Sequence, residues 1–490
     1  MPTPRPLADY SSYKGLPPLA GLCTVEEAAK PGLSVEECVR RLKRFHYAFK
    51  RLHQILTARI TAEPIYELKT AFAHHAYLCA EHVTALRTRI GEMREPPLGL
   101  EDVPHPALEV FFDEILNAPT TEELIWGAYQ HAIYGLITEI EFYQSETNPL
   151  SDAPSRRVLK FALLELNEMK QFGDKVCRAV PTPSTGSFWL NLLEALQEAS
   201  TGAYGSDAET MQYVELRLRE YSKSPYVYDP VPKRDERFSD PWNQGVNAEV
   251  FLYSDEYPAR AKALMMLYKR LREIDVPEMM ASILTQTPGK PWGYYRDMSR
   301  QLWDEARHAM MGEVGFVALG VDWTKARITF NWSYRLNTEC TPMERHGVLY
   351  FIEQGLMPKT GKRYEFETGQ ASGLPLIATI QDFDWADEVL HSQIGRQWYV
   401  PEFGSLQKAL EYGDAAWSKV LSNWATVKEQ GLTSHDNWWP AVYSQACAAE
   451  GVAPDPAVLA FAETYEGRRA DRKRVAAESL CKRTGEGVSG

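Results

Sequence analysis

Two short stretches of the chain place acidic residues and a histidine at helical spacing among apolar side chains. The first reads WDEARHAMMGE over residues 303–313, and the second reads WADEVLHSQIG over residues 385–395. In each stretch a Glu-x-x-His sequence puts both side chains on one helix face, with Cβ atoms about 5–6 Å apart. Carboxylate and imidazole groups at this spacing are typical ligands of divalent metal ions.

A single Glu-x-x-His is a weak signal, because composition alone supplies such spacings. The repetition is more specific, since an Asp precedes the Glu and a Gly follows the His by four residues in both stretches. The two motifs are Asp304-Glu305-x-x-His308 and Asp387-Glu388-x-x-His391. We therefore expect the two motifs to share one site that holds two metal ions.

The helices around such a site must supply the remaining carboxylates. A four-helix bundle binds two metals when two helices each give a Glu and the other two each give a Glu-x-x-His. On antiparallel neighbours, matching depth means an equal distance from the connecting turn. By this rule Glu273 lies opposite Glu305 across a turn near residue 289, and Glu353 lies opposite Glu388 across a turn near residue 370.

Glu278 is the reserve for Glu273, because Pro277 can distort that helix and shift its register. Four carboxylates buried together would repel one another unless cations neutralised them, and two divalent ions balance their charge. The mixed oxygen and nitrogen donor set favours Fe(II), Mn(II) or one of each, whereas structural zinc prefers thiolates.

Apolar residues at spacings of three and four predict long helices through most of the chain. We expect them near 34–63, 64–93, 121–146, 155–179, 256–287, 291–318, 340–357 and 372–398. Shorter helices are expected near 187–200, near 208–221 and beyond Pro401. The best strand candidate is ARITFNWSYRL at 326–336, and PKTGKRYEFETG at 358–369 is expected to be a connecting turn.

This order predicts an all-α fold with two four-helix bundles, a helical linker and a C-terminal helical cap. The expected boundaries are 1–180 for the first bundle, 181–254 for the linker, 255–400 for the metal-binding bundle and 401–490 for the cap. The chain also aligns with itself: when Phe72 is set on Met298, His82 falls on His308. When LNEMKQFG is set over ADEVLHSQIG, Glu168 falls on Glu388. The two matches favour an internal duplication.

The first bundle has lost most of the motif on that alignment. The positions of Glu305, His391, Glu273 and Glu353 carry Cys79, Gln171, Tyr47 and Thr138. We therefore expect a degenerate bundle that supports the second one. The alternative is a lone metal site built from His74, His75, Glu81 and Glu139.

The segments QLWDEARHAMMGEVGFVALG and DWADEVLHSQIGRQW resemble the metal-binding helices of ferritin-like di-iron carboxylate proteins, most closely the uncharacterised ferritin-like domains of bacteria. The resemblance is specific over about 265–400 and loose over 34–180. It implies two iron ions, with a Mn/Fe pair as the alternative. The implied ligands are Glu273, Glu305, His308, Glu353, Glu388 and His391. It also implies that Asp304 and Asp387 each hydrogen-bond the opposite histidine.

The function expected from these features is a di-metal oxidoreductase or oxygenase that activates O₂ and oxidises a small organic substrate, supplied by an electron donor. A homodimer is compatible with the sequence. The rival is a metal-binding or purely structural helical protein without O₂ chemistry. Iron storage is the least favoured variant, because storage cages assemble from small bundles rather than from a long duplicated chain.

Simpler interpretations of the motif residues are also compatible with the sequence. The two motifs could lie on exposed, charged helix faces, with Glu305 paired to a neighbour such as Arg307. His391 could be a core histidine bonded to Asp384. Trp303 and Trp385 are better explained by packing than by electron relay.

Composition limits the partners and the compartment. The net charge of −13 argues against a nucleic-acid or anionic-membrane surface, because such partners reward clustered Lys and Arg. No apolar run approaches the roughly 18 residues that span a bilayer. The seven cysteines are scattered without a CxxC pair, and the first residues lack a signal-peptide pattern. We therefore expect a cytoplasmic protein with reduced thiols.

Overall fold

The computed structural model describes residues 10–94, 99–181, 183, 186–200, 219–421 and 425–465. These residues form helices and no β-strand, so the expected all-α class is confirmed. The expected strand at 326–336 is wrong, because residues 326–330 are irregular and α13 spans Asn331–Glu339. A lone strand would leave its backbone N–H and C=O groups unpaired, whereas a helix pairs them internally.

The described residues fall into two compact units. Unit 1 comprises residues within 10–59 and 74–228, and unit 2 comprises residues within 60–73 and 229–465. The domain boundaries expected from the sequence stay predictions. Most of the helix expected at 208–221, and the cap beyond residue 465, lie outside the described residues.

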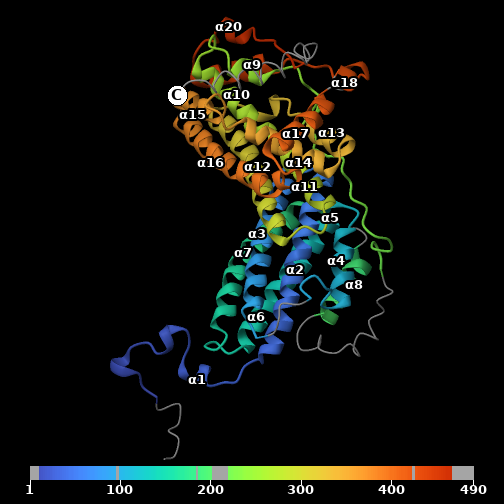
Figure 1. The fold of residues 1–490 in the computed structure, drawn as a ribbon, viewed down its shortest axis with the longest axis vertical. Helices are drawn as coiled ribbons and strands as arrows, with labels where there is room; N and C mark the ends of the chain where they lie inside the picture. The colour runs from blue at the N-terminus through green and yellow to red at the C-terminus, as the bar shows by residue number, and fades with distance from the viewer. Residues whose placement is uncertain are drawn as a thin grey trace, which may run out of the picture. The chain divides into compact units, whose positions relative to one another are not determined.

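Long helices run side by side in unit 1 (Figure 1). Ring contacts hold them together: Phe49 meets His82 with ring centroids 4.8 Å apart, and Phe45 meets Tyr143 at 5.8 Å. The α-helices that lie wholly or partly in this unit are α1 Val25–Ala28, α2 Val35–Ala62, α3 Tyr66–Gly91, α4 Pro106–Leu116, α5 Thr121–Ile125, α6 Tyr134–Glu146, α7 Ala153–Ala179 and α8 Gly186–Ser200. A π-helical segment, η4 Trp126–Ile133, joins α5 to α6.

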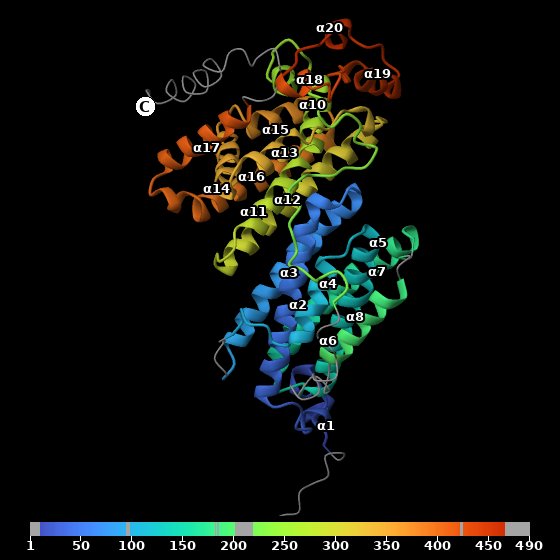
Figure 2. The same ribbon diagram turned by 90° about the vertical axis from the view of Figure 1, so that its right-hand side faces the viewer.

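Unit 2 contains the helices that carry both motifs (Figure 2). Its helices besides α13 are α9 Ala248–Leu252, α10 Ala259–Arg272, α11 Asp275–Gln286, α12 Trp292–Ala318, α14 Pro342–Gly355, α15 Lys362–Ala371, α16 Pro375–Trp398, α17 Leu406–Leu421, α18 Ala425–Glu429, α19 Trp439–Glu450 and α20 Pro456–Leu459. The 3₁₀ segments η7 Trp323–Lys325 and η8 Val400–Phe403 follow α12 and α16.

Four elements of unit 2 surround the motif residues: the α10–α11 pair, α12, α14 and α16. Helix α12 packs against α10, α11 and α16, while α14 packs against α11 and α16. Glycines allow two of these approaches to be close. A Cβ added at Gly312 would lie 2.3 Å from the backbone nitrogen of Leu271, and one at Gly395 would lie 2.2 Å from the Tyr350 ring.

The helix expected at 256–287 is broken in the structure. Helix α10 ends at Arg272 and α11 begins at Asp275, so Glu273 lies at the junction. Pro277 explains the break, because a helical proline lacks an N–H donor and its ring clashes with the carbonyl four residues earlier. That carbonyl belongs to Glu273.

The turn expected at 358–369 is also wrong in part. Helix α15 begins at Lys362 and packs against both α16 and α10. Glu365 of this helix is fully buried and pairs with Lys269 of α10. Lys362 and Glu365 are therefore buried ion-pair residues of a helix rather than residues of an exposed loop. Among the described helices, none is both long enough and apolar enough to cross a bilayer.

Candidate metal centre

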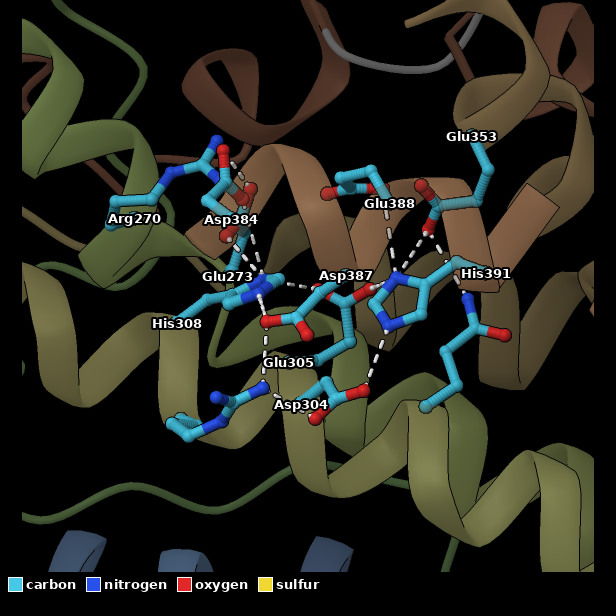
Figure 3. Close-up of polar contacts among 12 residues, drawn as sticks. Arg270, Glu273, Asp304, Glu305, His308, Glu353, Asp384, Asp387, Glu388 and His391 are labelled. Atoms are coloured by element: carbon cyan, nitrogen blue, oxygen red, sulfur yellow. Dashed lines mark hydrogen bonds and ion pairs between the residues drawn. The ribbon is translucent and has the colours of Figure 1, made fainter. Parts of the chain in front are cut away.

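The two Asp-Glu-x-x-His motifs face each other inside unit 2 (Figure 3). Helix α12 presents Glu305 and His308, and α16 presents Glu388 and His391. Their exposed fractions are 2 %, 0 %, 2 % and 1 % respectively. The interpretation that these motifs lie on exposed helix faces is therefore wrong.

Helix α14 and the α10–α11 junction bring the remaining carboxylates to the same place. Glu353 of α14 is 4 % exposed, and Glu273 is partly exposed at the break between the two helices. Together with the motif residues they complete the set of six expected from the sequence, and all six lie in one cluster (Figure 3). Their role as metal ligands stays a prediction.

Each histidine is oriented by the aspartate of the opposite motif. His308 Nε2 donates to Asp387 Oδ2 at 3.1 Å, and His391 Nε2 donates to Asp304 Oδ2 at 3.4 Å. Arg307 donates a hydrogen bond to each aspartate, at 2.6 Å to Asp304 Oδ1 and at 2.6 Å to Asp387 Oδ2. When Nε2–H is held by a carboxylate, the neutral ring keeps its lone pair on Nδ1. The pairing implied by the family resemblance is present in the structure.

The inward histidine atoms are surrounded by carboxylate oxygens. His391 Nδ1 lies 3.1 Å from Glu305 Oε1, 3.6 Å from Glu388 Oε2 and 3.9 Å from Glu353 Oε1. His308 Nδ1 lies 3.4 Å from Glu273 Oε2 and 3.7 Å from Glu305 Oε2. Glu305 thus offers one oxygen to each histidine, so a single carboxylate contacts both halves of the cluster.

Two groups of potential ligand atoms overlap at Glu305. One contains Glu305, Glu353, Glu388 and His391, and the other contains Glu273, Glu305 and His308. Within each group the potential ligand atoms lie within 4.8 Å of one another. A third overlapping group joins His308 and Glu388 to Asp384, which the sequence suggested as a partner of His391. Asp384 instead lies 3.6 Å from His308 Nδ1, so that interpretation of His391 is wrong.

One buried atom on each of the six residues lacks a hydrogen-bond partner. These atoms are Glu273 Oε2, Glu305 Oε1, His308 Nδ1, Glu353 Oε2, Glu388 Oε2 and His391 Nδ1. Buried polar atoms are nearly always hydrogen-bonded, and one without a partner costs about 1–3 kcal/mol. Two metal ions, one beside each histidine, would provide partners for these atoms.

The charges in the centre shift the pKa of each histidine upward. Burial alone would lower the pKa of His308, but contacts with Asp387 and Glu273 raise it to about 10. The pKa of His391 is likewise raised well above its ordinary value by Asp304 and Glu305, against the effect of burial. Both shifts favour the protonated imidazolium form, so a metal ion at Nδ1 would compete with a proton.

The carboxylates differ strongly from one another. Burial, reinforced by neighbouring Glu388 and Glu305, raises the pKa of Glu353 well above its usual range. Burial would also raise the pKa of Glu273, yet Arg270 and Lys362 lower it to about 2. Sequence reasoning missed these two basic residues.

Glu278 does not point into the centre. Its carboxylate lies in a separate buried cluster, 2.9 Å from Arg234 and in contact with Lys69, and it accepts from Ser333 Oγ at 2.8 Å. The break at Glu273 explains this, because α11 restarts in a new register and turns Glu278 toward α13. The reserve role expected for Glu278 is therefore not supported.

A cavity of about 240 Å³ adjoins the carboxylate side of the centre. Glu273, Glu305, Glu353 and Glu388 line it, whereas His308 and His391 are not among its described lining residues. Much of the remaining wall is apolar, from Val276, Met279, Leu336, Leu349, Ile352 and Leu356. A small molecule in this space would contact these four carboxylates.

Unit 1 arranges its histidines differently. His82 Nε2 lies 2.7 Å from Glu165 Oε2, His75 Nδ1 lies 2.7 Å from the Tyr129 hydroxyl, and Glu168 is exposed. Within its described residues, three or more His, Cys, Asp or Glu side chains do not converge closely enough to hold a metal ion.

No family model, curated protein or solved structure matches the chain. Functional inference therefore depends on the geometry of the centre itself.

Proposed function

We propose that the chain is a ferritin-like di-metal oxidoreductase or oxygenase, with two iron ions or a Mn/Fe pair held in unit 2. The observation that carries the proposal is the set of six buried atoms without hydrogen bonds, one on each expected ligand. The six residues come from α12, α14, α16 and the α10–α11 junction, and their inward nitrogen and oxygen atoms lie 3.1–3.9 Å apart. Buried polar atoms without hydrogen bonds are uncommon, so six of them in one cluster support a ligand site rather than a purely structural core.

The donor set divides naturally between two ions. Glu273 and His308 serve one position, Glu353 and His391 serve the other, and Glu305 and Glu388 lie between them. Carboxylate oxygens with one imidazole per ion suit iron or manganese rather than structural zinc. Such a pair, when bound, supplies the chemistry of O₂ activation, for which an external donor provides electrons.

The protein's own residues would orient the ligands and place the substrate. Asp304 and Asp387 hold the two imidazole rings so that Nδ1 faces the centre. The adjoining cavity of about 240 Å³ has room for a small organic molecule, and its apolar wall favours a substrate with a hydrophobic body. Burial would keep bulk water from the reacting groups.

The two units would descend from one duplicated bundle, of which only the second kept the ligands. His82 in α3 occupies the position of His308 and is buried, but it pairs with Glu165 rather than with a converging carboxylate set. Cys79 and Gln171 stand at the positions of Glu305 and His391. Unit 1 would then support unit 2 without binding metal.

Anaerobic loading with Fe(II), followed by metal analysis and O₂ uptake, tests this proposal. We expect about two iron ions per chain and O₂ consumption that depends on them. Glu305→Ala should lose both ions, because its oxygens face both histidines. Glu367→Ala, which removes an exposed carboxylate paired with Arg363, is the matched control and should keep both.

Two results would count against the proposal. If the chain retains no metal, the proposed metal centre is wrong and the protein is a helical scaffold. A chain that retains metal but consumes no O₂ would be a metal-binding protein without oxidase chemistry.

A further inference from the structure

Two basic side chains, Lys362 and Arg270, contact carboxylates in one half of the candidate metal centre. Lys362 Nζ lies 2.9 Å from Asp384 Oδ1, 2.8 Å from Glu388 Oε1 and 3.9 Å from Glu273 Oε1. Arg270 Nη2 lies 2.8 Å from Glu273 Oε1, and the same guanidinium contacts Asp384 (Figure 3). Both basic side chains are almost completely buried.

These contacts fall on the His308 side. Glu273 is the carboxylate that faces His308, and Asp384 lies 3.6 Å from the same ring nitrogen. Lys362 also holds the Glu388 oxygen that is not directed at His391. A cation beside His308 would therefore be repelled by the buried charges of Lys362 and Arg270. It would also have to share Glu388, which already pairs with Lys362.

The His391 side has a different environment. Among the described residues, Glu353 forms an ion pair with His391 and accepts a hydrogen bond from the neutral amide of Gln301 at 3.2 Å. Arg300 and Arg307 bind the outer aspartates Asp304 and Asp387 rather than the inward carboxylates. This side gathers four potential ligands within 4.8 Å in one group, of which only Glu388 contacts Lys362. His308 belongs to two groups of three, one with Glu273 and Glu305 and one with Asp384 and Glu388.

We infer that the two positions bind metal in a fixed order: the His391 position takes the first ion tightly, and the His308 position takes the second weakly. Lys362 and Arg270 compete with the second ion for its carboxylates. This inference rests on the proposed function, since it assumes that the centre binds two metals. Unequal positions would let the chain hold one ion alone or two different ions in sequence.

A neighbouring charge changes the affinity of a buried group for a proton by about one to three powers of ten. We expect a comparable effect on a metal ion, so the two dissociation constants should differ on the order of 100-fold. Titration of the metal-free full-length chain with Mn(II) measures this, because electron paramagnetic resonance counts unbound Mn(II) directly. The expected isotherm has one tight and one weak site.

Three variants and one control assign the sites. Lys362→Met removes one competing charge and should tighten the weak site by at least about tenfold. Lys262→Met is the matched control, because Lys262 is also buried but bonds the Tyr364 hydroxyl at 2.8 Å. His391→Ala should abolish the tight site, whereas His308→Ala should leave it. The histidine variants keep the test decisive if Lys362→Met does not fold.

The outcomes separate this inference from the proposed function. Two equally tight Mn(II) ions in the unmodified chain would overturn the inference alone. Loss of the tight site in His308→Ala rather than in His391→Ala would also overturn it. Absence of any Mn(II) binding, in a chain whose circular dichroism is helical, would overturn the proposed function together with the inference.

Discussion

The charged groups of the candidate metal centre are arranged in two layers. Glu305 and Glu388 lie between the histidines, while Asp304 and Asp387 lie behind them and hold their outer nitrogens. Each aspartate belongs to the opposite helix from the ring it holds. The hydrogen bonds therefore tie α12 to α16 while fixing both rings, so orientation of the ligands and packing of the helices depend on the same contacts.

Asp387→Ala should weaken metal binding at the His308 position by about 10–100-fold, which is typical when the carboxylate behind a ligating histidine is removed. His308 Nε2 would lose its 3.1 Å contact, and the ring would be free to rotate. Equilibrium dialysis with Mn(II) measures the change.

Glu367→Ala again serves as the control, since it removes an exposed carboxylate of α15. Unchanged affinity in Asp387→Ala would show that this pairing does not orient the ring. A loss of helical content would instead show that Asp387 acts mainly through its contact with Arg307.

The sequence identified the acidic and histidine residues of the cluster but not its basic ones. The repeated motif and the matching-depth rule located Glu273 and Glu353, because side-chain direction on a helix follows from spacing. Arg270 lies in the run YKRLRE, which resembles a solvated helix face, and Lys362 lies in a Gly- and Thr-containing segment that resembles a turn. A buried basic residue leaves no periodic signal unless its acidic partners are already known.

At the scale of elements, the break between α10 and α11 sets the position of Glu273. A continuous helix was expected, yet the residue selected by the matching-depth rule still lies in the cluster. The rule could not have shown that Glu273 lies at a helix end, where it reaches the cluster from the junction. That detail depends on Pro277, whose effect on a helix varies with its tertiary neighbours.

Gly312→Ala should destabilise unit 2, because the new methyl group would meet the backbone of α10 rather than a movable side chain. The nearest atoms are Leu271 N at 2.3 Å and Leu267 O at 2.7 Å. Overpacking of this kind typically costs about 1–3 kcal/mol. For a unit of this size the melting temperature should fall by about 2–12 °C, as measured by scanning calorimetry.

Gly355→Ala is the matched control. Gly355 ends α14, and a Cβ added there meets nothing within 4 Å. This substitution should be neutral, or stabilising by about 0.4–1 kcal/mol, because alanine lowers the conformational entropy of the unfolded chain. Equal destabilisation by both substitutions would contradict the close α10–α12 approach.

At the scale of the whole molecule, the sequence predicted the helical class but not that the turn between α2 and α3 groups with unit 2. The turn between α2 and α3 belongs to unit 2, although most of both helices belongs to unit 1. A continuous apolar stripe predicts that a helix is buried along one side, but it does not tell which neighbours cover each end. The expected strand failed for a related reason, because β-prone residues form a strand only where another strand pairs with them.

Metal binding should protect unit 2 selectively, because the six proposed ligands all lie in that unit. Any ion that binds only the folded state stabilises it by mass action, by about 4 kcal/mol at a thousandfold excess over the dissociation constant. We therefore expect saturating Mn(II) to slow amide exchange in α12, α14 and α16 by up to about a thousandfold, and a chelator to reverse it. Exchange in α6 and α7, whose described residues belong to unit 1, should not change.

Hydrogen exchange followed by mass spectrometry resolves these helices, and Glu305→Ala should abolish the effect. Protection spread evenly over both units would place the metal outside this cluster.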